Sequence, residues 1–134
     1  AGPTQCHCGA CIEDYRITAF DTFYHNGKRI DPQKYIVARV DGDCMSARGI
    51  YPGNLIFIQK VTDCEKKKLQ KGDILYIKYE RDGFSGFKIR EFNSTNGEDA
   101  VNTIYYTAES RPKESRTPHR LENIEGVVKY NFKS

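Results

Sequence analysis

Short stretches of alternating apolar and polar residues follow one another along most of the chain. From Tyr15 onward they are rich in β-branched and aromatic residues, which pack well on a pleated sheet, and several alternate with a period of two. The stretches are YRITAF (15–20), YIVARV (35–40), NLIFIQKV (54–61), DILYIKYE (73–80), FKIREF (87–92), NTIYY (102–106) and NIEGVVKYNF (123–132). This pattern predicts a mostly-β fold of antiparallel strands.

Turn-forming residues separate the predicted strands. They are Asn26-Gly27, Pro52-Gly53, Lys71-Gly72-Asp73, Asp82-Gly83 and Asn96-Gly97. No segment after residue 15 carries twelve residues of helical periodicity, so we expect only one or two short helical turns, around 44–48 and 63–68. The polar stretches 64–71 and 109–120 are predicted to be surface connections, with His119 exposed to solvent.

The first fourteen residues, AGPTQCHCGACIED, show no apolar periodicity and hold three of the five cysteines. We therefore predict two parts, a flexible arm over 1–14 and a β domain over 15–134. The run Cys6, His7, Cys8 and Cys11 offers ligands that zinc prefers, and Cys64 or His25 could complete a set of four with the three cysteines. A second Cys pair at matching spacing is missing, so an arm with free thiols is the preferred interpretation, and no metal or cofactor is expected.

Charge and length restrict the function classes. The 134 residues suit one domain, and the net charge is +3 with Lys and Arg interspersed among Asp and Glu. Nucleic-acid-binding domains usually show a basic stripe, so direct DNA binding by this chain is not expected. No apolar run is long enough to cross a bilayer, and no secretory signal pattern is seen. We expect a cytoplasmic protein, in a compartment that keeps the thiols reduced.

Cys44 is the strongest candidate for chemistry, because it lies where the chain turns out of the stretch 35–40. A nucleophile on such a turn can use the backbone N–H groups that follow it to stabilise an oxyanion. A nearby cation or base would activate the thiol. Lys88 and Arg90 alternate with apolar residues in a later strand and share one face of it. Equally, Cys44 could be a small buried apolar residue with no chemical role.

The segment VDGDCMSARGIYPGNLIFI (40–58) resembles the signature of the self-cleaving peptidase family of LexA, UmuD and the phage repressors. Cys44 stands at the family's serine, and Asn54 stands at an aspartate. KGDILYIKY (71–79) resembles the next strand of the family, FKIREF (87–92) the strand with the general-base lysine, and RLENIEGVVKY (120–130) the closing strand. The likeness covers about residues 35–130 and implies a LexA-like domain of curved antiparallel strands.

The resemblance also implies roles for individual residues. The family cuts its own chain at an Ala-Gly or Cys-Gly bond about three dozen residues before the nucleophile, and Cys8-Gly9 lies at that spacing from Cys44. Backbone N–H groups of Cys44 and Met45 would form the oxyanion site. Lys88 is the preferred general base, whereas an alignment without a gap places Arg90 there, and arginine stays charged and cannot act as a base.

Two functions follow. The first is the carboxy-terminal regulatory domain of a LexA or phage-repressor type transcription regulator, as in the SOS response, which dimerises and cleaves its own linker. The second is an inactive oligomerisation or sensing domain of the same fold. The family implies a homodimer or higher homo-oligomer, and a recombinase filament as co-inducer. It also implies DNA contact through an amino-terminal helix-turn-helix domain, of which these residues show no pattern. No membrane partner is expected.

Overall fold

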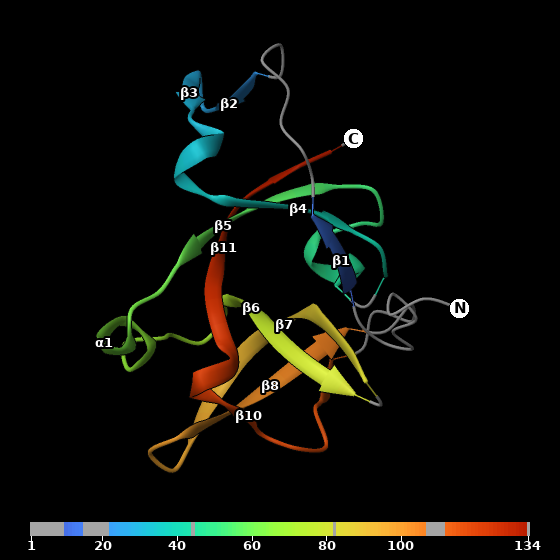
Figure 1. Cartoon of the computed structure of the whole chain (residues 1–134). Coiled ribbons are helices and arrows are strands. Elements are labelled where there is room, and N and C mark those ends of the chain that lie inside the picture. The colour runs from blue at the N-terminus through green and yellow to red at the C-terminus, as the bar shows by residue number, and fades with distance from the viewer. Residues whose placement is uncertain (1–9, 15–21, 44, 82, 107–111, 134) are drawn as a thin grey trace.

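The computed structural model describes residues 10–14, 22–43, 45–81, 83–106 and 112–133, which consist mostly of β-strands (Figure 1). The strands are β1 (Ala10–Asp14), β2 (Phe23–His25), β3 (Lys28–Ile30), β4 (Ile36–Val40), β5 (Leu55–Lys60), β6 (Ile74–Arg81), β7 (Phe84–Asn96), β8 (Ala100–Tyr106), β9 (Pro112–Glu114), β10 (His119–Arg120) and β11 (Ile124–Phe132). Helical structure is short: α1 (Asp63–Lys66) and the 3-10 turns η1 (Pro32–Lys34), η2 (Ser46–Arg48) and η3 (Leu121–Asn123). The predicted mostly-β fold is confirmed.

The principal sheet has nine strands and closes on itself. Its order is β1-β4-β5-β11-β6-β7-β8-β10, with β9 on β8, and a further pairing of β1 with β7 completes a ring of six strands. All these pairs are antiparallel. In Figure 1, β4 and β5 lie on one side, β6, β7 and β8 lie opposite, and β11 connects the two halves. The separate β2–β3 hairpin lies at the end away from β8 and β10.

Strand β7 is long enough to belong to both parts of the sheet. Its first half pairs with β1 and β6, and its second half pairs with β8 from Glu91 to Asn96. The register with β8 shifts between Phe92 and Ser94. An irregularity of this kind bends a strand and increases its twist, so β8 and β10 can turn away from the ring.

Three groups of buried side chains hold the strands together. The central cluster comprises Ala38, Val40, Met45, Ile50, Ile56, Ile58, Tyr76 and Ile89. The β8 cluster comprises Leu75, Ile77, Phe92, Val101, Ile124 and Val127. The hairpin cluster comprises Ile30, Val37 and Phe57, with Phe23, Tyr35, Tyr130 and Phe132 packed around it. Because alternate residues of a strand point to opposite faces, neighbours such as Leu75 and Tyr76 belong to different clusters.

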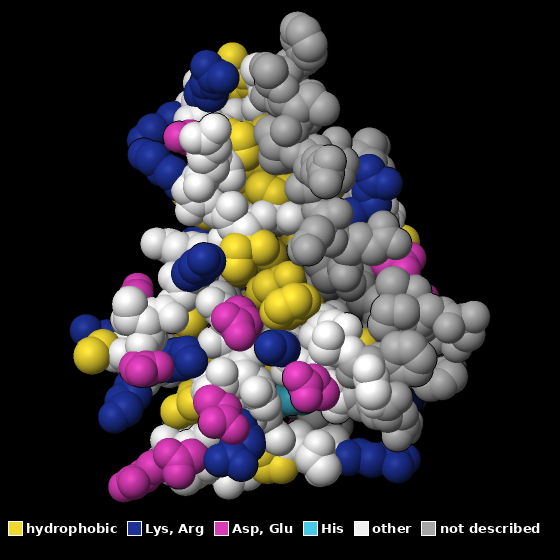
Figure 2. Space-filling model, viewed as in Figure 1, with side chains coloured by type: hydrophobic (Ala, Val, Ile, Leu, Met, Phe, Trp, Pro, Cys, Tyr) yellow, Lys and Arg dark blue, Asp and Glu magenta, His cyan; other side chains and the backbone are white. Residues whose placement is uncertain are grey.

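The charged side chains are mixed in sign on the face shown in Figure 2. Hydrophobic side chains gather in the middle of this face, between the β4–β5 and β6–β7 sides, and Lys, Arg, Asp and Glu are interspersed around them. On this face no basic stripe is seen among the described residues, in line with the mixed charges of the sequence.

Local sequence explains where the hairpins and the helix form. At the β2–β3 hairpin Asn26 has φ 52° and Gly27 has φ 76°. A two-residue turn with positive φ at both positions matches the twist of the flanking strands, and Asn-Gly is the sequence that tolerates it best. Helix α1 begins after Thr62, whose side chain accepts from the Glu65 N–H while the Glu65 carboxylate accepts from the Thr62 N–H.

The sequence interpretation differs from the structure in two segments. Residues 10–14, which it placed in the arm, form β1 within the principal sheet. The stretch 109–120, interpreted as a loop, contains β9 and β10, both of which pair with β8. The predicted helical turns at 44–48 and 63–68 correspond to η2 and α1. The predicted strand 15–20 lies outside the described residues.

Candidate functional site

The loop after position 44 is held to the sheet at several points. Met45 is fully buried in the central cluster. Its carbonyl accepts from the N–H groups of Arg48 (2.9 Å) and Ile50 (3.3 Å). Gly49 closes η2 with a φ of 81°, which favours glycine. The loop therefore has a defined shape and a side chain that fixes it to the core.

A second set of contacts ties this loop to β11. The carbonyl of Gly49 accepts from the Asn131 side chain at 2.9 Å and from the Asn54 side chain at 3.4 Å. The Asn54 amide also donates to Asn131 Oδ1 at 3.0 Å. Asn54 is buried, so its hydrogen bonds replace those it would make with water. Asn54 thus connects the end of η2 to β11.

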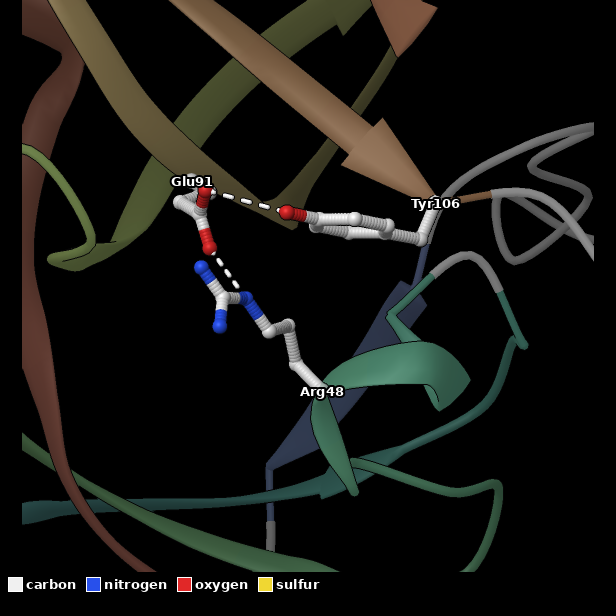
Figure 3. Close-up of polar contacts among 3 residues, drawn as sticks. All are labelled: Arg48, Glu91 and Tyr106. Carbon is white, nitrogen blue, oxygen red and sulfur yellow. Dashed lines mark hydrogen bonds and ion pairs between the residues drawn. The ribbon is translucent and has the colours of Figure 1, made fainter. Parts of the chain in front are cut away.

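The charged group of β7 that reaches this loop is Glu91. Its carboxylate is almost completely buried, receives the Nε–H of Arg48 from η2, and accepts from the Tyr106 hydroxyl at 3.2 Å (Figure 3). The Arg48 guanidinium lies over the Tyr106 ring, 5.4 Å from its centroid. The carboxylate thereby has a cation and a hydroxyl as partners, which a buried charge requires.

The same contacts keep Arg48 charged. Burial lowers the pKa of Arg48, while the hydrogen bond and the negative charge of Glu91, aided by Tyr106, raise that pKa by more. The net direction is upward. In this position Arg48 and Glu91 form an ion pair that joins η2 to β7.

Lys88 and Arg90 lie on the opposite face of β7. The β6–β7 register pairs Lys88 with Ile77 and Arg90 with Leu75, and directly paired residues share a face. Ile77 and Leu75 belong to the β8 cluster. The Lys88 ammonium lies 5.5 Å from the centroid of the Tyr79 ring. Both basic residues therefore share a strand face with members of the β8 cluster.

The residues that share a face of β7 with Glu91 belong to the central cluster. Ile89 pairs with Tyr76, and both pack in the cluster that contains Met45. The described side chains therefore do not bring Lys88 or Arg90 to Met45. Cys44, Cys8 and Gly9 lie outside the described residues, so the nucleophile, the scissile bond and the oxyanion site remain predictions.

Strand β1 lies between β4, which precedes Cys44 in the chain, and β7, which carries Lys88. Ile12 pairs with Val40 at the end of β4, four positions before Cys44 in the chain. Ala10 and Cys11 pair with Ile89 and Lys88 of β7. The strand that follows Cys8-Gly9 in sequence therefore lies between β4 and β7.

His119 differs from its sequence expectation. It is partly buried rather than exposed to solvent, and its Nε2 is buried with no hydrogen-bond partner among the described residues. Burial, and then the positive charges of Lys88 and Arg90, lower the pKa of His119 to about 4. The imidazole is therefore neutral at pH 7.

Sequence reasoning missed Arg48, Glu91 and Tyr106. The sequence did contain one indication of this pair. Glu91 is an acidic residue that shares a strand face with the apolar Phe87 and Ile89. A carboxylate on an apolar face needs a cation, and Arg48 supplies it from η2. Which cation would do so could not be read from the sequence, because the two residues are 43 positions apart.

Among the described residues, no group of three or more His, Cys, Asp or Glu side chains could hold a metal ion. Cys64 is a free, exposed thiol. No helix in the described part of the chain is long and apolar enough to cross a membrane.

Comparisons with protein-family models, with curated proteins and with solved structures find no match to this chain.

Proposed function

We propose that the chain is the regulatory domain of a LexA-type transcription regulator and that it binds its own arm as a strand of its sheet. The observation that carries the proposal is β1, which pairs with β4 through Ile12 and with β7 through Cys11 and so closes the ring. A segment held in this way can transmit the state of the domain to whatever precedes it in the chain. The four sequence landmarks of the family supply the regulatory class.

The geometry favours a domain that holds the arm without cutting it. The charged group that β7 directs toward η2 is Glu91, already paired with Arg48, whereas Lys88 and Arg90 lie on the other face of the strand. The face of β7 on which Glu91 lies carries no described lysine. This supports the sensing or oligomerisation function over the peptidase function.

The partners expected for such a regulator follow from the resemblance. The domain would form a homodimer or a higher homo-oligomer, and a separate helix-turn-helix domain would bind DNA. A recombinase filament would be the co-inducer.

Hydrogen exchange measured by NMR tests whether the arm is bound. In Cys11→Pro the residue cannot donate a ladder hydrogen bond and its φ is fixed, so β1 should leave the sheet. We expect the amides of β4 and β7 beside β1 to exchange at least tenfold faster, while the β5–β11 amides keep their rates. Cys11→Ser, which retains the N–H, is the control. Unchanged exchange in the proline variant would contradict a bound arm.

Self-cleavage is the second candidate, and the register of β1 favours it. Cys11 lies opposite Lys88, three positions after Cys8. In this mechanism the Cys44 sulfur attacks the Cys8 carbonyl carbon and Lys88 accepts the thiol proton. Backbone N–H groups of Cys44 and Met45 stabilise the oxyanion. Lys88 then returns the proton to the departing Gly9 amine, and water hydrolyses the thioester.

Variants of the proposed general base test self-cleavage. Their intact masses are measured after incubation at alkaline pH, which increases the neutral fraction of lysine. If the dyad works, residues 1–8 are lost from the parent and from Arg90→Met, and Lys88→Met keeps its full mass. Cleavage that continues in Lys88→Met would exclude Lys88 as the base.

A further inference from the structure

The orphan nitrogen of His119 marks a second site, on the far face of β7. His119 pairs with Val101 of β8, and paired residues share a face. Val101 packs in the β8 cluster with Leu75 and Ile77, which are the direct cross-strand neighbours of Arg90 and Lys88. The side chains of Lys88 and Arg90 on β7 and of His119 on β10 therefore lie on the same face of the sheet.

The first argument for a ligand at this site is the buried nitrogen atom of His119, which lacks a hydrogen-bond partner among the described residues. Buried polar atoms are normally hydrogen-bonded, and those that are not often mark an unseen water or ion. His119 Nε2 is such an atom among the described residues. In one of its two neutral tautomers Nε2 carries the proton and can donate to an acceptor. A partner that lies beside two cations will be favoured if it is negatively charged.

Lys88 and Arg90 supply the positive charge. The Arg90 guanidinium lies 5.0 Å from the centroid of the Tyr105 ring, and its Nη1 donates to the Ile89 carbonyl at 2.8 Å. Lys88 lies over the Tyr79 ring. Each of the two cations therefore contacts an aromatic ring, in addition to the other interactions that it makes. A guanidinium has five N–H donors and an ammonium has three, so an anion can add to the contacts these groups already make.

We propose that Lys88, Arg90 and His119 together bind a phosphate group. Arginine and lysine are the usual ligands of phosphate oxygens, and a neutral histidine adds one more N–H donor. The phosphate gives His119 Nε2 an acceptor and adds to the contacts that Lys88 and Arg90 already make. This site goes beyond the proposed regulatory function, and its test does not depend on cleavage or on the arm.

The test is an NMR titration of the wild-type chain with inorganic phosphate at pH 7, with ionic strength held constant by chloride. We expect the His119 ring signals to shift and saturate, with a dissociation constant in the millimolar range or below. Lys88→Gln and His119→Gln should weaken binding at least tenfold. Lys78→Gln, which removes an exposed lysine from the adjacent strand β6, should bind like the wild type. Arg90→Met adds a third variant if it folds.

Adenosine monophosphate is a second probe, because a phosphate group can be free or part of an ester. Equal affinity for the two probes supports recognition of the phosphate group alone, and tighter binding of the nucleotide supports a phosphate monoester as the ligand. A shift that grows linearly, as it does with chloride, would overturn the proposal. So would a Lys88→Gln variant that binds phosphate as tightly as the wild type.

Discussion

At the scale of single residues, the structure shows an ion pair between Arg48 and Glu91 that no motif indicated, and the expected Cys44–Lys88 arrangement stays a prediction. The alternation of FKIREF correctly placed Lys88 and Arg90 on one face, because side chains alternate along a strand. Which face meets the loop after Cys44 depends on the register with β6, where Ile89 pairs with Tyr76. That register is a tertiary property, and the local sequence does not determine it.

The Arg48–Glu91 pair should contribute to stability, because Glu91 is only 2% exposed. Arg48→Met leaves the carboxylate buried without its cation, and we expect a loss of about 2 kcal/mol in the free energy of unfolding. Urea unfolding measures this loss, with Arg29→Met, which replaces an exposed arginine of β3, as the control. In the double variant Arg48→Met/Glu91→Leu much of the loss should be recovered. A loss below about 0.5 kcal/mol in Arg48→Met would show that the pair has little energetic weight.

His119 should make the fold sensitive to mild acid. Its folded pKa of about 4 is below the usual value of 6.5, so the unfolded chain takes up the proton first as the pH falls. The stabilisation is complete above pH 6.5 and is lost as the pH falls to about 4. After allowance for partial exposure we expect about 2 kcal/mol. Urea unfolding of the wild type and of His119→Gln across this pH range should show that the free energy of unfolding declines less in the variant. Parallel curves would exclude His119 as the cause.

At the scale of elements, the sequence predicted those strands that carry their own periodicity and hairpin turns. β4, β5, β6, β8 and β11 follow the stretches expected for them. The short strands β1, β2, β3, β9 and β10 were not predicted, because they carry no apolar periodicity, and the pairing of β1 depends on β4 and β7, which are distant from it in the chain. Contacts between segments far apart in the chain decide such strands, and local propensity is a weak guide to them.

Gly126 illustrates an element held by close backbone approach. A Cβ at this position would lie 2.5 Å from the Gln59 carbonyl oxygen and from the Ile58 Cγ2 of β5. Gly126→Ala should therefore push β11 from β5 and lower the free energy of unfolding by about 2 kcal/mol. Gly86→Ala is the matched control, since its nearest atoms belong to the movable Tyr79 ring at 3.3 Å. Similar unfolding curves for the two variants would contradict the argument.

At the scale of the whole molecule, the ring of strands explains how one chain can hold its own arm. Closure through β1 removes two free strand edges, on β4 and on β7, that would otherwise be open to pairing with other chains. The closed ring fits a regulator that changes state when the arm moves. The segments 40–58, 71–79 and 120–130, on which the proposed family assignment rests, all lie on or next to strands of this ring.

The proposed regulator should be a dimer. Analytical ultracentrifugation of the chain should give twice the chain mass of 15.4 kDa at micromolar concentration. Cys64→Ser, which removes an exposed thiol, controls for pairs linked through that thiol and should leave the mass unchanged. A monomer at all concentrations would contradict the predicted dimer.

The most direct test of the account is intact-mass spectrometry of the chain incubated from pH 7 to pH 10, beside Cys44→Ser and Cys44→Ala. Because β7 presents the paired Glu91 to the loop after Cys44, we predict an unchanged mass for all three at every pH. Far-UV circular dichroism would confirm that each sample stays folded. Loss of the mass of residues 1–8 from the wild type or from Cys44→Ser, but not from Cys44→Ala, would contradict this and establish a self-cleaving domain.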